Sequence, residues 1–139
     1  MTDTAAWAAL LRVHARIVPK LDRELRDRCD LPLTWYDVLL ELNSATDRRL
    51  TMGELGQVAV VSRTRVTRIV DELIHAGLVE RHPHPDDRRS TIVAITAAGR
   101  RRFRRAAPVY VRGIEEHFSR HVGQDAKTVA RALERVLDA

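Results

Sequence analysis

The sequence contains one cysteine, Cys29, among its 139 residues. A single cysteine excludes an intramolecular disulfide framework and suits a reducing compartment. No segment approaches the roughly 18 consecutive apolar residues that would span a membrane, and the N-terminus lacks a basic stretch followed by an apolar one, so no secretory signal is evident. We therefore expect one compact cytoplasmic domain, residues 1–139, without a membrane partner.

The sequence patterns of common enzyme sites are also missing. There is no Gly-x-Ser-x-Gly elbow, no His-Glu-x-x-His pair, no Walker loop and no glycine-rich dinucleotide turn. We expect neither catalysis nor a cofactor.

Positive charge is what the chain has in excess. It carries 24 basic and 19 acidic residues, for a net charge of +5, and only Lys20 and Lys127 are lysines. A basic domain gains affinity for phosphate backbones through counterion release, so nucleic acid is the leading class of partner. An anionic membrane is the alternative, but no basic amphipathic helix with a bulky aromatic face is apparent.

Helical periodicity dominates both ends of the chain. Residues 5–28 predict an amphipathic helix that kinks or restarts near Pro19. A second helix is predicted to begin at a Thr34 cap. Near the C-terminus, residues 97–120 predict a helix with a kink at Pro108, and residues 125–137 predict a last amphipathic helix.

Two short capped helices are predicted in the middle of the chain. Thr51 and Glu54 form a capping box that opens the first, which reaches Ala59. Ser62 is a good N-cap for the second, and Gly77 sits where a left-handed C-cap is wanted. The second helix has an apolar stripe made of Val66, Ile69, Val70 and Leu73. Two such helices joined by a tight turn make a helix-turn-helix.

A hairpin follows directly. Residues 78–81 and 91–95 predict two strands, and the proline- and aspartate-rich residues 82–90 predict the turn between them. A hairpin after a helix-turn-helix is a wing. The predicted fold class is therefore mainly α with a small β wing.

The second helix of this motif has a polar face opposite its apolar stripe. Helical geometry places Thr64, Arg68, Asp71 and His75 there, flanked by Arg65 and Thr67. Arginine and threonine hydrogen-bond base edges and phosphates, and a helix N-terminus favours phosphate. A solvated helix face is the alternative, but the position before a wing favours DNA binding.

Four segments carry a family resemblance: "LPLTWYDVLLEL", "LTMGELG", "SRTRVTRIVDELIHAGLVER" and "DDRRSTIVAITAAGRR". They resemble the MarR family of bacterial winged helix-turn-helix transcription regulators over residues 31–105. The resemblance implies a winged DNA-binding region, 31–96, between dimerisation helices in 5–30 and 97–139. It also implies a homodimer on a pseudo-palindromic DNA operator, more often a repressor than an activator, released by a small and often phenolic effector.

The wing pattern of this family, Asp-x-Arg, falls on Asp87 and Arg89, while Ile95 replaces the usual leucine. The resemblance implies that Arg89 enters the minor groove and that Asp87 orients its guanidinium. Arg88 suits a phosphate contact. The full set of predicted DNA-binding residues is Ser62, Arg63, Thr64, Arg65, Thr67, Arg68, Asp87, Arg88 and Arg89.

The resemblance also implies an effector cleft between the dimerisation helices and the winged region, and the candidates to line it are His14, Trp35 and Tyr36. Trp35 and Tyr36 fit the core or the dimer interface equally well. The residues expected at that interface are Val111, Ile114, Phe118, Val129, Leu133 and Val136.

Two other functions remain open: a winged-helix module that binds protein, and a redox-sensing regulator acting through Cys29. Arginines beside Cys29 favour its thiolate, whereas neighbouring aspartates oppose it. His117 and His121 have the spacing of two metal ligands, with Glu116 adjacent but no third ligand assured. We expect surface histidines and no metal.

Overall fold

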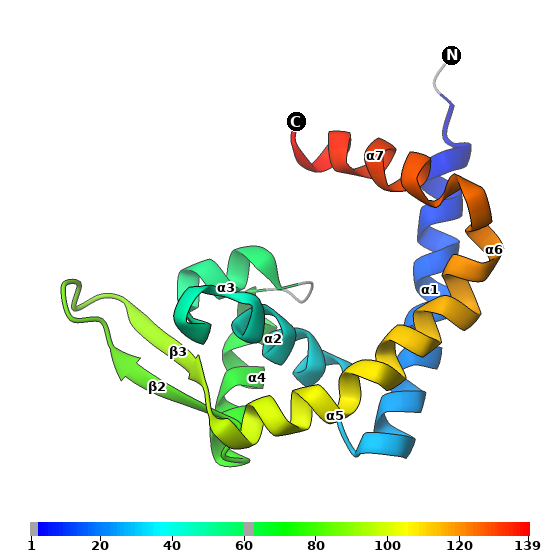
Figure 1. Cartoon of the computed structure of the whole chain (residues 1–139). Helices are drawn as coiled ribbons and strands as arrows, with labels where there is room; N and C mark the ends of the chain where they lie inside the picture. Colours follow the sequence, from blue (N-terminus) through cyan, green and yellow to red (C-terminus); the bar gives the residue numbers. More distant parts are fainter. Residues whose placement is uncertain (1–2, 60–62) are drawn as a thin grey trace.

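The computed structural model describes residues 3–59 and 63–139 as a mainly helical chain with one small sheet, as expected (Figure 1). The helices are α1 (Ala5–Cys29), α2 (Leu33–Ser44), α3 (Met52–Val58), α4 (Arg63–His75), α5 (Ala97–Ile114), α6 (Arg120–Val122) and α7 (Ala126–Leu137). The strands are β1 (Arg49–Thr51), β2 (Val79–Pro83) and β3 (Thr91–Ile95). Among the described residues, no helix is both long and apolar enough to cross a membrane.

The sheet has three antiparallel strands in the order β1-β3-β2. Val93, in the central strand, lies opposite Leu50 on one side and Arg81 on the other. The β2–β3 hairpin was predicted, but β1 was not, because three residues are too few to show a readable alternation. Since β1 ends where α3 begins, it attaches the wing directly to the helix-turn-helix.

The core forms where the apolar faces of α1, α2, α4, α5 and the sheet meet. Tyr36 lies within it, with ring centroids 5.3 Å from Phe103 and 4.6 Å from Tyr110. The largest fully buried side chains are Leu25, Leu31, Leu39, Leu42, Leu55 and Leu73, with Val38, Val66, Val70, Val79 and Val93. Burying a leucine side chain stabilises the folded state by about 1.5–3 kcal/mol relative to leaving it exposed. These buried side chains therefore hold the helices and the sheet of the winged region together.

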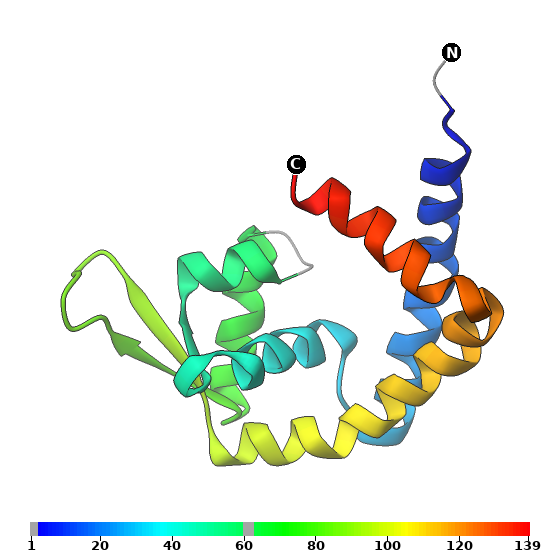
Figure 2. The same ribbon diagram turned by 45° about the horizontal axis from the view of Figure 1, so that its top comes forward.

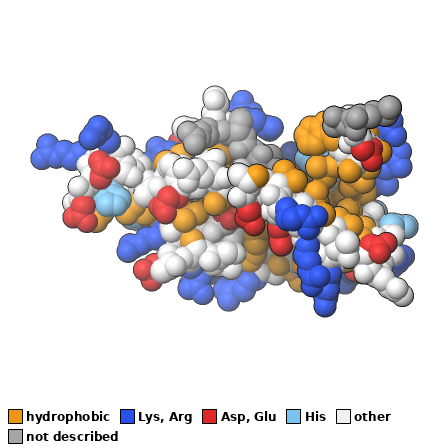
Figure 3. All heavy atoms as spheres, turned by 90° about the horizontal axis from the view of Figure 1, so that it is seen from above, with side chains coloured by type: hydrophobic (Ala, Val, Ile, Leu, Met, Phe, Trp, Pro, Cys, Tyr) orange, Lys and Arg blue, Asp and Glu red, His pale blue; other side chains and the backbone are white. Residues whose placement is uncertain are grey.

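The molecule has two ends joined by α5, which leaves the wing and runs alongside α1 (Figure 2). The far end, formed by α1 and the C-terminal helices, gathers hydrophobic side chains at its surface (Figure 3). No residue of α7 is buried, although the helix is amphipathic. The winged end therefore buries its own apolar face, whereas this end does not.

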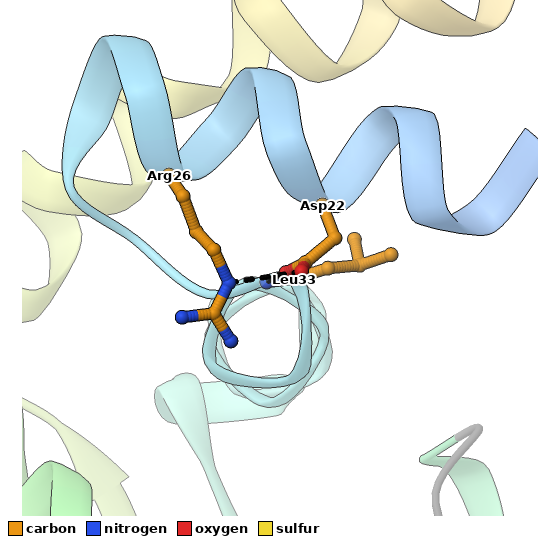
Figure 4. A network of polar contacts seen from close by, with 3 residues as sticks. All are labelled: Asp22, Arg26 and Leu33. Carbon is orange, nitrogen blue, oxygen red and sulfur yellow. Dashed lines mark hydrogen bonds and ion pairs between the residues drawn. The ribbon is translucent and has the colours of Figure 1, made fainter.

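A side chain of α1 stabilises the start of α2, and no side chain at the N-cap of α2 does so. Asp22 accepts hydrogen bonds from the Leu33 backbone N–H and from Arg26 Nε, both at 2.9 Å (Figure 4). The predicted Thr34 cap is wrong, because α2 begins one residue earlier and no side chain at its N-cap bonds the first turn. A carboxylate at this position also complements the positive end of the helix dipole.

The helix does not restart at Pro19, because α1 is continuous through it. Likewise, α5 continues through Pro108. Both prolines are exposed, so the carbonyls that lose a helical partner can bond water. A π-helical segment, Glu115–Ser119, follows α5 directly.

Thr96 joins the end of α4 to the start of α5. Its hydroxyl accepts from the Gly99 N–H at 3.0 Å, which makes Thr96 the N-cap of α5, and donates to the Gly77 carbonyl at 2.8 Å. Gly77 has the predicted left-handed conformation, with φ of 76°. At Gly99, a Cβ would lie 2.1 Å from the Leu78 carbonyl oxygen, so only glycine permits this close approach.

We therefore expect Thr96→Ala to lower the free energy of unfolding by about 2 kcal/mol, because it removes both a helix cap and a tether. Thr96→Ser keeps the hydroxyl and should recover most of the loss. Urea unfolding of the three proteins measures the effect. Equal midpoints for the alanine and serine variants would contradict this role.

Candidate nucleic-acid interface

The second helix of the helix-turn-helix, α4, has the two faces that its periodicity predicts. Val66, Ile69, Val70 and Leu73 are buried against the core. On the opposite side, the described part of the predicted DNA-binding set is exposed: Thr64, Arg65, Thr67 and Arg68. The predicted Ser62 cap lies outside the described residues, and Arg63 is the first residue of α4.

The first helix, α3, is held at its start by the predicted capping box. Thr51 N–H donates to Glu54 Oε1 at 2.9 Å, and Glu54 N–H donates to Thr51 Oγ1 at 3.1 Å. Hydrogen bonds from the Thr51 backbone and side chain lower the pKa of Glu54. With Leu55 fully buried, these contacts fix α3 as a support beneath α4.

The wing tip is organised by bonds from side chains to its own backbone. His84 Nδ1 accepts from the N–H groups of Asp86 and Asp87, at 3.0 and 3.1 Å. Asp87 Oδ1 then accepts from the Arg89 backbone N–H at 3.0 Å. The sequence did not predict the role of His84, although a histidine before Pro-Asp-Asp is a turn-forming context.

This geometry differs from the expected contact between Asp87 and the Arg89 guanidinium. Within the described chain, the Asp87 carboxylate bonds the backbone and no ion pair joins the two side chains. Arg88 and Arg89 are both exposed at the tip, so their guanidinium groups project into solvent from an ordered turn. Asp87 shapes the loop that presents them.

The base of the wing is tied to α4 by an ion pair that no sequence spacing rule predicts. Arg81 Nη2 on β2 lies 2.6 Å from Asp71 Oδ1. Asp71 was placed on the polar face of α4, and its carboxylate holds the wing there. Both side chains are largely exposed, so the pair adds little to stability but relates the wing to the helix.

The three candidate effector residues do not come together. Tyr36 is a core residue, and burial raises its pKa to about 12. The Trp35 indole donates to Glu72 on α4 at 3.2 Å, and His14 is exposed on α1. The three side chains do not line a common cleft, because one lies in the core, one contacts α4 and one is exposed on α1.

A groove of about 650 Å³ lies elsewhere, between α1 and the chain that follows α5. Its walls include Ile17 and Phe118, with Arg12, Arg16 and Lys20 along α1. This volume is within the range of small-molecule sites, about 300–1,000 Å³.

Cys29 is buried in the core, with 4% of its surface exposed. A redox-sensing thiol needs access to oxidant, so its burial disfavours the redox-sensing alternative.

The two C-terminal histidines have different surroundings. His117 is partly buried and its Nε2 lies 2.6 Å from Glu24 Oε1, whereas His121 is exposed. His121 therefore lies at the surface, as expected of both histidines, whereas His117 is partly buried against Glu24, a contact that spacing could not predict.

An exposed, basic second helix beside an ordered hairpin with two arginines at its tip defines a winged helix-turn-helix, which is a class of DNA-binding protein. Residues 30–90 match the model of the MarR family. A transcriptional repressor from Pseudomonas putida, IacR, is 30% identical over 129 residues, which cover 93% of this chain and 73% of the relative.

Solved structures agree. A MarR family transcriptional regulator from Streptomyces coelicolor, crystallised in complex with DNA, matches with a TM-score of 0.87 and 25% identity, covering 99% of this chain and 88% of the other. A second regulator from that organism, AbsC, gives a TM-score of 0.87 and 26% identity, covering 99% and 95% of the two chains. The chain belongs to the MarR family of winged helix-turn-helix transcription regulators, which are not enzymes.

We expect Arg89→Ala to weaken operator binding by about 1 kcal/mol or more, most where the flanking minor groove is narrow and A·T-rich. Asp87→Ala should cost less, since it loosens the turn but leaves the arginine. Fluorescence anisotropy with labelled duplexes measures both losses. In a double-mutant cycle, a coupling of at least about 0.5 kcal/mol indicates that the two residues act together.

Asp87→Asn separates the two possible roles of the carboxylate. Its amide oxygen can still accept from the Arg89 backbone N–H, so a backbone role predicts near-normal binding. If Asp87→Asn were as weak as Asp87→Ala, the negative charge itself would matter on DNA and the turn-shaping role would be wrong.

Proposed function

We propose that this protein is a homodimeric, sequence-specific repressor that binds a pseudo-palindromic operator and is released by a small molecule. The observation that carries the proposal is the exposed Thr/Arg face of α4 beside the arginine-tipped wing. The family's repressors and the relative crystallised with DNA support it. A winged module that binds protein would not need arginine and threonine at the N-terminal end of this helix.

The unburied apolar surface at the α1–α7 end supports a homodimer. Its most exposed members are Trp7, Leu11, Val111, Val136 and Leu137, between 51% and 82% exposed. An apolar patch of this kind usually marks an association surface, and Figure 3 places it away from the wing. Two-fold symmetry would then set the recognition helices about one DNA turn, roughly 34 Å, apart.

The effector is proposed to occupy the groove between α1 and the chain after α5. Its apolar walls and three cationic side chains would suit a small amphipathic compound. This position replaces the cleft first expected around Trp35 and Tyr36. A ligand there would touch α1, which also carries part of the proposed dimer surface.

We expect Arg68→Ala and Thr64→Ala each to cost about 1–3 kcal/mol on the cognate operator and much less on random DNA, if these side chains reach base edges. The operator can be sought in the DNA upstream of the protein's own gene, and binding followed as salt is raised. His75→Ala, at the opposite end of α4, is the matched control and should bind normally. Equal losses on both DNAs would instead identify phosphate contacts.

We expect Leu133→Asp with Val136→Asp to give monomers that bind the operator at least tenfold more weakly, because the acids would have to be buried in the interface. Light scattering and anisotropy measure the two effects. Lys127→Asp places an acid on the opposite face of α7 and should leave the dimer intact. A double variant that remains dimeric would show that α7 is not at the interface.

A further inference from the structure

Three side chains with metal-ligating atoms meet where α1 passes the end of α5. Glu24 comes from α1, and Glu116 and His117 come from the π-helical segment. One ligand atom from each lies within 4.8 Å of the others, and His117 Nε2 is 2.6 Å from Glu24 Oε1. The sequence placed Glu116 beside His117 and His121 but assured no further ligand. The fold supplies Glu24, 93 residues from His117, and leaves His121 outside the cluster.

Packing fixes Glu24 in this position. Gly113 is buried against α1, and a Cβ there would lie 2.8 Å from Glu24 Oε2 and 2.6 Å from Leu21 Cδ2. The glycine therefore allows the two helices to approach until the carboxylate faces His117. The side chains of His117 and Glu24 are only 21% and 30% exposed, so both ligands are partly shielded from water.

The local backbone brings the other two ligands to the same place. Glu116 and His117 are neighbours within the π-helical turn, a rare conformation that often occurs at functional sites. One imidazole nitrogen and two carboxylate oxygens form a mixed donor set that suits a divalent first-row transition ion.

We propose that Glu24, Glu116 and His117 bind a divalent transition ion of the zinc type, with water completing the coordination. Zinc bonds of about 2.0–2.2 Å would place tetrahedral ligand atoms about 3.4 Å apart. His117 Nε2 and Glu24 Oε1 would therefore separate by less than about 1 Å from their present contact. The two carboxylates offset the charge of the divalent ion.

A bound ion would join α1 to the chain that leads into α7. These are the elements that carry the exposed apolar surface, so the ion would fix the relative direction of the two halves of the proposed dimer interface. The proposal of a metal site depends only on the geometry of the three ligands. Its effect on the operator rests on the proposed function.

Isothermal titration of the untagged protein with zinc chloride tests the site. We expect one ion per chain and a higher melting temperature with zinc than with chelator. Glu24→Gln and His117→Gln should each reduce zinc affinity at least about tenfold. His121→Gln, one turn further on and outside the cluster, is the matched control and should bind zinc normally.

Cobalt substitution gives a second readout. We expect visible d–d absorption that His117→Gln removes, without a thiolate charge-transfer band, because Cys29 is buried elsewhere. Melting in chelator establishes that each variant is folded.

An equal loss of zinc in His121→Gln and His117→Gln would assign the ion to the histidine pair and overturn this ligand set. Operator binding by a wild-type protein that takes up no zinc would overturn the metal site and leave the proposed function intact. Zinc uptake without any change in operator affinity would retain the site and overturn its regulatory effect.

Discussion

The hydroxyl of Thr96 is the contact on which the arrangement of the whole molecule depends. It bonds the Gly77 carbonyl, just beyond α4, and the Gly99 amide in the first turn of α5. The β2–β3 hairpin is the stretch of chain between those two points. The junction at Thr96 therefore positions three elements: α4, the base of the hairpin and the start of α5. A small movement at this junction would alter all three together.

Two kinds of surface result from this plan. The winged end completes its own hydrophobic core and leaves polar side chains on α4 and at the wing tip, suited to a hydrated, charged partner such as DNA. The other end keeps apolar residues in solvent, suited to a second copy. Because α5 spans both ends, a single helix connects the proposed dimer surface to the proposed DNA-binding surface.

Features set by neighbouring residues could be predicted from the sequence. The Thr51–Glu54 box, the Gly77 cap and the β2–β3 hairpin each need residues only a few positions apart, so their pattern is visible in the chain. The contacts Asp22–Leu33, Asp71–Arg81 and Glu24–His117 could not be predicted, because they join elements whose relative position only packing decides. The alternatives for Tyr36 stayed open for the same reason: aromatic character does not distinguish a core position, where Tyr36 lies, from a cavity wall.

The capping of α2 by Asp22 has a mechanical consequence. The DNA-binding region cannot be energetically independent of α1, because a fragment cut at residue 31 would lose the acceptor for the first amide of α2. Two residues after Leu33, the Trp35 indole donates to Glu72 on α4. Two hydrogen bonds at the first turn of α2 thus link α1 to α4, the helix that carries the candidate DNA-binding residues.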